Sequence, residues 1–260
     1  MSVIIELSGV SCAGKTTVFP IVLNCLHQND NKCFEASQFI STLAIRRFEK
    51  IVKRQTSGTY RMLSISMVRK GLIASGFLRV DLLKQHKQVA GYVYDYGHSL
   101  KCFRSYLVKL GMHHLIRKAM GNQRILIDEG VVHTVQSIFV SKSFPVNSKP
   151  KLRNDLEAYL NSIPLPDILV VVYNRNQQEL NHRLLTRGHH RLSVANPSER
   201  KQFVKNSVYV EQVMLDILSL RQEIKIIKIP IEDNDYLASM KKGIQETLSH
   251  AIVQTKPPAV

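Results

Sequence analysis

The fold of this chain is decided by Gly9-Val10-Ser11-Cys12-Ala13-Gly14-Lys15-Thr16. The spacing is G-x-x-x-x-G-K-[ST], the pattern of a phosphate-binding P-loop. Residues 2–7 before it are mostly apolar, which predicts a buried strand, and residues 17–27 after it carry apolar side chains on one side, which predicts a helix. A glycine loop between a strand and a helix is the context in which this motif binds phosphate.

The residue types of the motif explain its chemistry. Gly9 and Gly14 allow backbone angles and a close approach that side chains would block. The N–H groups of the loop then face a phosphate at a helix N-terminus, where the helix dipole favours an anion. Lys15 would reach the β- and γ-phosphates, and the Thr16 hydroxyl would bind Mg²⁺. The expected cofactors are therefore ATP and Mg²⁺, with nucleotide contacts from Gly9, Ser11, Cys12, Ala13, Gly14, Lys15, Thr16 and Thr17.

Composition limits the class of protein. The 260 residues, 44% of them hydrophobic and 22% charged, suit a single domain with a sizeable core. Apolar runs are too short for a transmembrane helix, and the N-terminus shows no signal-peptide pattern. The four cysteines have neither metal-ligand nor disulfide spacing, so we expect a reducing, cytoplasmic location. The oligomeric state stays open, and a homodimer is one possibility.

Positive charge is concentrated in one part of the chain. The net charge is +16, and residues 40–121 hold 16 Lys and Arg against three acids. Such a surplus predicts an anionic partner, which is a phosphorylated small molecule, a nucleic acid or an anionic membrane. The alternative is a solvated basic surface that serves solubility.

Strand and helix patterns alternate along the chain, which predicts an α/β fold with a parallel sheet and helices on both faces. We expect one three-layer P-loop kinase-like domain over residues 1–260, with five parallel strands, a helical acceptor-binding insertion at 38–121 between strands two and three, and an arginine lid at 183–196. The expected strands are 2–7, 32–36, 124–130, 167–173 and 224–229. The expected helices after the insertion are 131–141, 152–163, 177–187, 197–223 and 235–253, followed by a loose tail. Within the insertion, breaks are expected near 56–58, 71–76 and 91–97.

Acidic residues end two of these strands. Right-handed crossovers place the carboxyl ends of parallel strands on one edge, where ligands bind. Asp128 there would hold Mg²⁺ or cap the next helix. Glu129 would polarise a water, take the proton of an acceptor hydroxyl, or bind the first-turn N–H groups. Glu35 is a competing base or a surface acid, and His133 is a further candidate to line the cleft.

Arginines recur after the fourth strand. Arg183, Arg187 and Arg191 are spaced by four residues, before and after Gly188. Guanidinium groups match the charge that phosphoryl transfer spreads over the γ-oxygens, so these residues are candidates to close over the phosphates. The alternative is a solvated basic helix face.

Taken together, these features resemble the P-loop nucleoside and nucleotide kinases, most nearly thymidylate-kinase-like proteins. The resemblance covers most of the chain and rests on the P-loop, Glu35, Asp128, residues 166–172 and residues 179–188. It implies transfer of the ATP γ-phosphoryl group, with Lys15 and Thr16 binding phosphate and Mg²⁺, Glu35 as the acid after strand two, and Arg183, Arg187 and Arg191 as lid arginines.

The chain departs from that pattern at two points. Asp128-Glu129-Gly130 stands where thymidylate kinases have Asp-Arg, and Glu35-Ala36 stands where they have Glu-Pro. The arginine that would contact an acceptor phosphate is absent, and Glu129 fits an acceptor other than a nucleoside monophosphate.

Three hypotheses of function follow. The first is a small-molecule kinase in which Asp128 orients the metal, Glu35 or Glu129 takes the acceptor proton, and the basic insertion binds an anionic or polyhydroxylated acceptor. Arg46, Arg79, Arg104 and Tyr96 are candidate acceptor contacts. The second is a P-loop ATPase or polynucleotide-acting enzyme that uses Asp128 and Glu129 as a Walker B pair. The third is a regulator that binds ATP without turnover.

Overall fold

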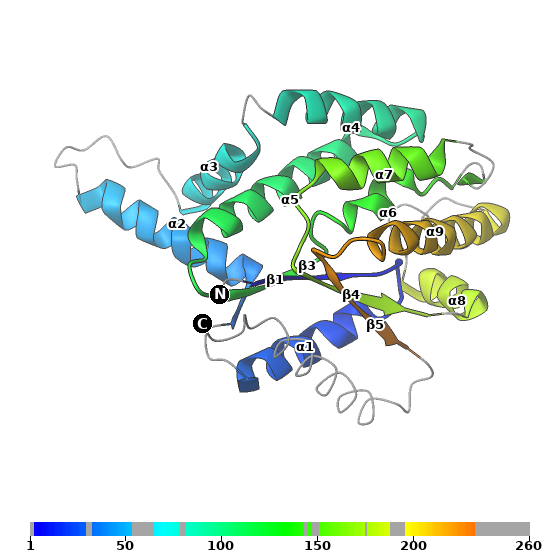
Figure 1. Ribbon diagram of the computed structural model, residues 1–260, viewed down its shortest axis with the longest axis horizontal. Helices are drawn as coiled ribbons and strands as arrows, with labels where there is room; N and C mark the ends of the chain where they lie inside the picture. Colours follow the sequence, from blue (N-terminus) through cyan, green and yellow to red (C-terminus); the bar gives the residue numbers. More distant parts are fainter. Residues whose placement is uncertain are drawn as a thin grey trace.

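Five parallel strands form the centre of the molecule. The computed structural model describes residues 3–29, 33–53, 65–78, 82–142, 145–146, 151–174, 176–187 and 196–231. Their sheet has the order β2-β3-β1-β4-β5, and every pair of neighbours is parallel (Figure 1). The strands are β1 (Val3–Ser8), β2 (Cys33–Glu35), β3 (Arg124–Asp128), β4 (Ile168–Tyr173) and β5 (Lys225–Pro230).

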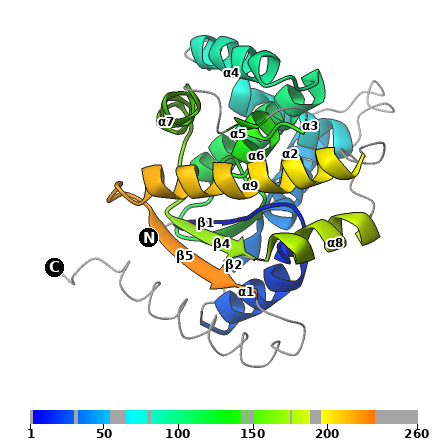
Figure 2. The ribbon, with the colours of Figure 1, turned by 90° about the vertical axis from the view of Figure 1, so that its right-hand side faces the viewer.

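Helices cover both faces of this sheet, as the alternating pattern predicted. Helix α1 lies on one face, whereas α5, α6 and α9 lie on the other, with α4 and α7 farther from the sheet (Figures 1 and 2). The structure therefore has the expected three-layer, P-loop kinase-like α/β fold. The helices are α1 (Lys15–Asn29), α2 (Ala36–Lys53), α3 (Ile65–Phe77), α4 (Leu83–Asp95), α5 (Leu100–Ala119), α6 (Thr134–Phe139), α7 (Leu152–Ser162), α8 (Gln177–Arg187) and α9 (Pro197–Leu218).

The central strands are apolar because they are covered on both sides. All six residues of β1 are buried, and so are the first five of β4. Residue Leu7 of β1 pairs with Asp128 of β3, and Leu126 of β3 pairs with Glu35 of β2. The carboxyl ends of β2, β3 and β1 therefore share one edge. The P-loop follows β1, between β3 and β4, where chain connections diverge and α/β sheets bind ligands.

One helix break expected in the insertion is wrong, and another is confirmed. The break expected at 71–76 is absent, because α3 continues through Gly71 and Gly76. The break expected at 91–97 is present, because α4 ends at Asp95 and α5 begins at Leu100, with Gly97 at φ 70° between them. A Cβ at Gly76 would lie 2.4 Å from the backbone oxygen of Gly111 in α5, so this glycine permits a close helix crossing rather than a break.

Other boundaries also differ from the expectation. The helix expected at 131–141 spans only Thr134–Phe139, after a turn, and the helix expected to reach residue 223 ends at Leu218. The expected break at 56–58, the helix at 235–253 and the tail at 254–260 lie outside the described residues. No helix in the described part of the chain is long and apolar enough to cross a membrane.

Candidate active site

The P-loop has the backbone geometry that its glycines predict. Gly9 has φ 148°, and a Cβ there would lie 2.2 Å from the carbonyl oxygen of Val172 in β4. Gly14 has φ 106°, and Cys12 has φ 66°. The Gly14 carbonyl accepts the N–H groups of Thr17 and Val18 at 3.0 and 3.1 Å. The loop thus turns tightly against β4 and leads directly into α1, which begins at Lys15.

Lys15 connects the P-loop to the segment after β3. Its buried Nζ donates to the carbonyls of Gly9 and Val10, both at 3.0 Å. The same Nζ lies 3.3 Å from Oε1 of Glu129, which is also 3.3 Å from Nε2 of His133. The structure therefore brings the P-loop lysine into one cluster with Glu129 and His133 of the segment after β3.

The amide groups before α6 are bound by Glu6 of β1. The N–H of Val132 donates to Glu6 Oε2 at 3.2 Å, and the N–H of His133 donates to Oε1 at 2.8 Å. The N-cap position of α6 is His133, whose side chain makes no capping bond. The first three amides of α6 donate to backbone carbonyls of residues 131–133. The alternatives that Asp128 caps this helix or that Glu129 binds its first amides are therefore wrong.

Sequence reasoning did not identify Glu6. The carboxyl is fully buried, and burial raises its pKa to about 7, while the bonds from the His133 and Val132 amides act in the opposite direction. A single acid inside the apolar run of residues 3–7 is the signal that could have found it, because buried carboxyls need specific partners.

Asp128 and Thr16 are the two residues that the sequence predicts as Mg²⁺ ligands. Both are exposed at the carboxyl edge of the sheet, and Asp128 pairs in register with Leu7, shortly before the P-loop. Lost hydration and the neighbouring Glu129 raise the pKa of Asp128, whereas Lys15 and Lys109 lower it. One hydroxyl and one carboxylate fit Mg²⁺, which keeps several waters and takes further ligands from phosphates. The described residues contain no cluster of three or more His, Cys, Asp or Glu side chains suited to a metal.

Glu35 lies farther from the P-loop than Glu129 does. It ends β2, and β3 separates that strand from β1. Its carboxylate accepts a hydrogen bond from the Ser37 hydroxyl. The site edge thus contains both acids, but Glu129 alone of the two contacts Lys15.

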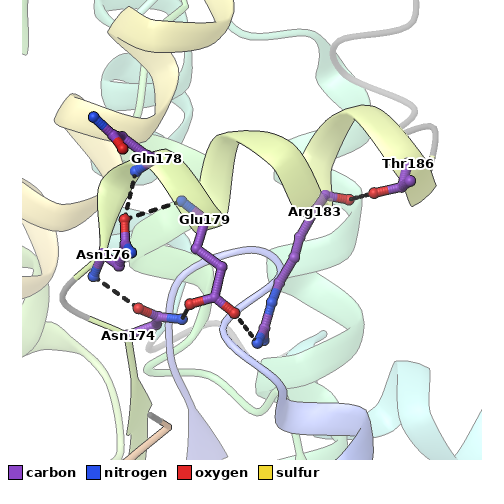
Figure 3. Close-up of polar contacts among 6 residues, drawn as sticks. All are labelled: Asn174, Asn176, Gln178, Glu179, Arg183 and Thr186. Carbon is purple, nitrogen blue, oxygen red and sulfur yellow. Dashed lines mark hydrogen bonds and ion pairs between the residues drawn. The ribbon is translucent and has the colours of Figure 1, made fainter. Parts of the chain in front are cut away.

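Arg183 of the expected lid is placed beside the P-loop. A guanidinium nitrogen of Arg183 lies 3.8 Å from where a Cβ of Gly14 would be. Its other terminal nitrogen pairs with Glu179, which accepts a bond from the Asn174 amide at 2.7 Å (Figure 3). Bonding to Asn174, and then the charge of Arg183, lower the pKa of Glu179. The rest of the expected lid lies outside the described residues, namely the side chain of Arg187 and residues 188–195, which include Arg191.

Two cavities border the cluster of Lys15, Glu129 and His133. The larger, of about 590 Å³, extends from the P-loop to α5, α6 and α9, and the smaller, of about 370 Å³, lies between α5 and the end of β3. Glu129 lines both. The larger is lined by Ser11, Gly97, His98, Ser99, Lys101, Cys102, Ser105, Lys109, Glu129, His133, Gln136, Ser137, Ser141, Lys142 and Phe203. The smaller is lined by Lys101, Arg104, Ser105, Val108, Lys109, Met112, Ile127, Asp128, Glu129 and Gly130.

The residues expected to contact the acceptor lie in different parts of the structure. Arg104 lines the smaller cavity. Tyr96 belongs to the core, with its hydroxyl donating to Asp155 at 3.1 Å, so its expected place in the site is wrong. Arg46 is exposed on α2 and lines neither of these two cavities, and Arg79 lies outside the described residues.

Lys109 is a site residue that sequence reasoning missed. It lines both cavities, and burial lowers its pKa, while the charges of Glu129, Glu6 and Asp128 oppose that change. Lys101, Ser105 and Lys109 are spaced by four residues, which places them on one face of α5. This four-residue spacing of polar side chains is the pattern in the sequence that could have identified Lys109.

Glu211 of α9 is a second buried acid that was missed. It accepts the N–H of Val10 in the P-loop, and burial raises its pKa to about 7, against the effect of Lys15 and of that hydrogen bond. It stands in an otherwise apolar stripe with Val204, Leu215 and Leu218, all buried. An acid on the apolar face of a helix is the pattern that could have revealed it.

Known proteins resemble this chain in structure and not in sequence. No family model matches the chain, and no curated protein matches its sequence. The crystal structure of thymidylate kinase from Ehrlichia chaffeensis matches with a TM-score of 0.40 and 14% identity, over 95% of this chain and 98% of that one. The fold assignment itself rests on the strand order and on the P-loop between β1 and α1.

Proposed function

We propose that this protein is an ATP-dependent kinase that transfers the γ-phosphoryl group to a small-molecule acceptor. One observation carries the proposal. The Glu129 carboxylate lies 3.3 Å from the P-loop lysine and also lines the larger cavity, which reaches Ser11 of the P-loop. Phosphates on the P-loop and an acceptor in the cavity would meet at this carboxylate.

The donor half of the site uses the P-loop. Its amides and the N-terminus of α1 would hold the β- and γ-phosphates, and Lys15 would exchange Glu129 for a phosphate oxygen. Thr16 and Asp128 would hold Mg²⁺, which, when bound, neutralises charge on the phosphates. Arg183, together with Arg187 and Arg191, would balance the charge that develops on the transferring group.

The acceptor half uses the cavity. Serine hydroxyls and the ammonium groups of Lys101, Lys109 and Lys142 line it, which favours a hydroxylated acceptor with negative charge. In the reaction the acceptor oxygen bonds to the γ-phosphorus, the bond to the ADP oxygen breaks, and the acceptor proton passes to Glu129. We favour Glu129 over Glu35 as this base because Glu35 lies beyond β3 and lines neither of the two cavities.

The test measures ADP release from ATP–Mg²⁺, with mass spectrometry to detect a phosphorylated acceptor. Parallel reactions contain no acceptor, pools of nucleosides, nucleotides or sugars, or single-stranded nucleic acid. Lys15→Ala is the inactive variant, and Lys118→Ala, which removes an exposed lysine of α5, is the matched control. We expect turnover only with a small-molecule pool, and a loss of about 10²- to 10³-fold in Lys15→Ala.

Other outcomes point to the other hypotheses. Turnover without any acceptor, or turnover stimulated by nucleic acid, would contradict the kinase and favour an ATPase in which Asp128 and Glu129 act as a Walker B pair. Steep dependence of that stimulation on salt would mark a nucleic-acid partner. ATP binding without turnover under any condition would favour a regulator.

A further inference from the structure

We propose that Glu6 is a positioning residue whose carboxylate, reaching from β1, fixes the segment 129–133 and thereby directs Glu129 toward Lys15. The effect on catalysis rests on the proposed kinase function, whereas the effect on the segment does not. Glu6 itself lines neither of the two cavities beside the P-loop, so it would act through the segment.

The hydrogen bonds to Glu6 provide the first argument. Its two carboxylate oxygens accept separate amides, from His133 at 2.8 Å and from Val132 at 3.2 Å, and the Val131 amide also acts on it. Bonds to an ionised acceptor are about twice as strong as neutral ones. A carboxylate from a distant strand thus binds the amides of the turn that precedes α6.

The turn above Glu6 provides the second argument. The Glu129 N–H donates to the Leu7 carbonyl at 3.1 Å, which extends the β1–β3 pairing by one residue. Glu129 then adopts φ 51°, and Gly130 follows directly above the carboxyl. A Cβ on Gly130 would lie 2.5 Å from Oε2 of Glu6. Glu6 and Gly130 are therefore sterically matched, and the turn that they allow places the Glu129 carboxylate 3.3 Å from Lys15.

The surroundings of Glu6 make this contact sensitive to pH. The titratable side chains that act on it are Lys109 of α5 and Tyr159 of α7, and Lys109 is also influenced by the charges of Glu129 and Asp128. Burial raises the pKa of Glu6 to about 7. Protonation turns one acceptor oxygen into a hydroxyl, so one of the two amide bonds weakens as the pH falls below about 7.

The test compares hydrogen exchange in Glu6→Gln and in the wild-type full-length chain. Glutamine keeps the shape but loses one acceptor oxygen. We expect amide exchange in a peptide covering 129–135 to rise about 10- to 100-fold, with no change in a peptide from β4. Glu157→Gln, which replaces an exposed acid of α7, is the control and leaves both peptides unchanged.

Activity supplies the second measurement. In Glu6→Gln we expect ATP affinity to stay within about twofold and kcat to fall about 10-fold or more. In the wild type, kcat should rise with pH through an apparent pKa near 7, and we expect this limb of the pH–rate profile to disappear in Glu6→Gln. A purely structural role would lower the amount of folded enzyme without moving that limb.

Each outcome decides the proposal. Unchanged exchange over 129–135 in a folded Glu6→Gln variant would overturn it, whatever the activity. Should that variant not fold, Glu6→Asp, which keeps the charge but shortens the reach of the carboxylate, replaces it. Exchange over 129–135 that stays unchanged in a folded Glu6→Asp variant would then overturn the proposal. A wild-type protein without turnover removes the kinase proposal but leaves the exchange result decisive for Glu6.

Discussion

The P-loop and the segment 129–133 lie at the same sheet edge and meet through Lys15 and Glu129, yet the sequence specifies them in different ways. Both contain a non-glycine residue with positive φ, Cys12 in the first and Glu129 in the second. The P-loop shape follows from eight contiguous residues. The segment after β3 takes its shape from Glu6, which is 126 and 127 positions away from the amides that it accepts. A local motif is therefore visible in a sequence, whereas a contact between distant strands is not.

The largest expected effect separates the two acids at this edge. We expect Glu129→Gln to lower kcat by about 10²- to 10⁴-fold, because it removes the proposed base beside Lys15. Glu35→Gln should change kcat less than about threefold, because that carboxyl lies beyond β3 and bonds to Ser37. The measurement is the initial rate of phosphorylated-acceptor formation at saturating ATP.

The reverse order of these two rates would move the base to β2 and make Glu129 only a partner of Lys15. ATP binding is the control measurement, since neither substitution changes the P-loop itself. A large rise in ATP dissociation constant in Glu129→Gln would show that this residue organises the donor site instead.

Gly9 of the P-loop and Gly130 of the segment 129–133 test whether the first region depends on a backbone contact and the second on the Glu6 side chain. Gly9→Ala forces a Cβ against a backbone carbonyl of β4 at a positive φ, and we expect it to lower the free energy of unfolding by about 3 kcal/mol. In Gly130→Ala the new Cβ would clash with the side chain of Glu6, and we expect the free energy of unfolding to fall by about 1–3 kcal/mol. Urea denaturation measures both.

The two glycines should respond differently to a second substitution. In a Glu6→Ala background the clash at Gly130 is gone, so the effect of Gly130→Ala should shrink by about 1 kcal/mol or more. The effect of Gly9→Ala should be the same in both backgrounds. Additive behaviour of Gly130→Ala with Glu6→Ala would mean that the segment is not held by this contact.

Much of the fold could be predicted from the sequence because the strands are buried on both faces and nearly uniformly apolar. Residues 3–8 and 168–173 are clear examples. Helix ends inside the insertion were less predictable, because a glycine such as Gly76 serves a helix crossing and not a break. Composition and spacing do not distinguish these two roles.

The candidate site was predictable to the extent that its residues belong to a motif or end a strand. Lys15, Asp128 and Glu129 satisfy that condition. Lys109 and Glu211 do not, because α5 and α9 reach the P-loop only through tertiary packing. The side-chain roles of Arg187 and Arg191 stay predictions.

The smallest effect concerns Glu211, the acid that binds the P-loop from α9 as Glu6 binds the other segment. Burial raises its pKa from 4.5 to about 7, while the Val10 amide, Lys15 and Lys228 oppose the change. Between those values the folded state holds a proton that the unfolded state has lost, so this group's contribution to stability falls as pH rises. From pH 6 to pH 8 the fall is on the order of 1 kcal/mol.

Glutamine does not ionise, so Glu211→Gln should lack this loss of stability at high pH. We therefore expect its free energy of unfolding, measured relative to that of the wild type, to be about 1 kcal/mol higher at pH 8 than at pH 6. Urea denaturation at the two pH values measures this difference, with Glu157→Gln as the exposed control that shows none. An equal difference between wild type and Glu211→Gln at both pH values would mean that Glu211 is ionised in the folded protein throughout this range. The positive charge of Lys15 would then balance the Glu211 carboxylate beside the P-loop.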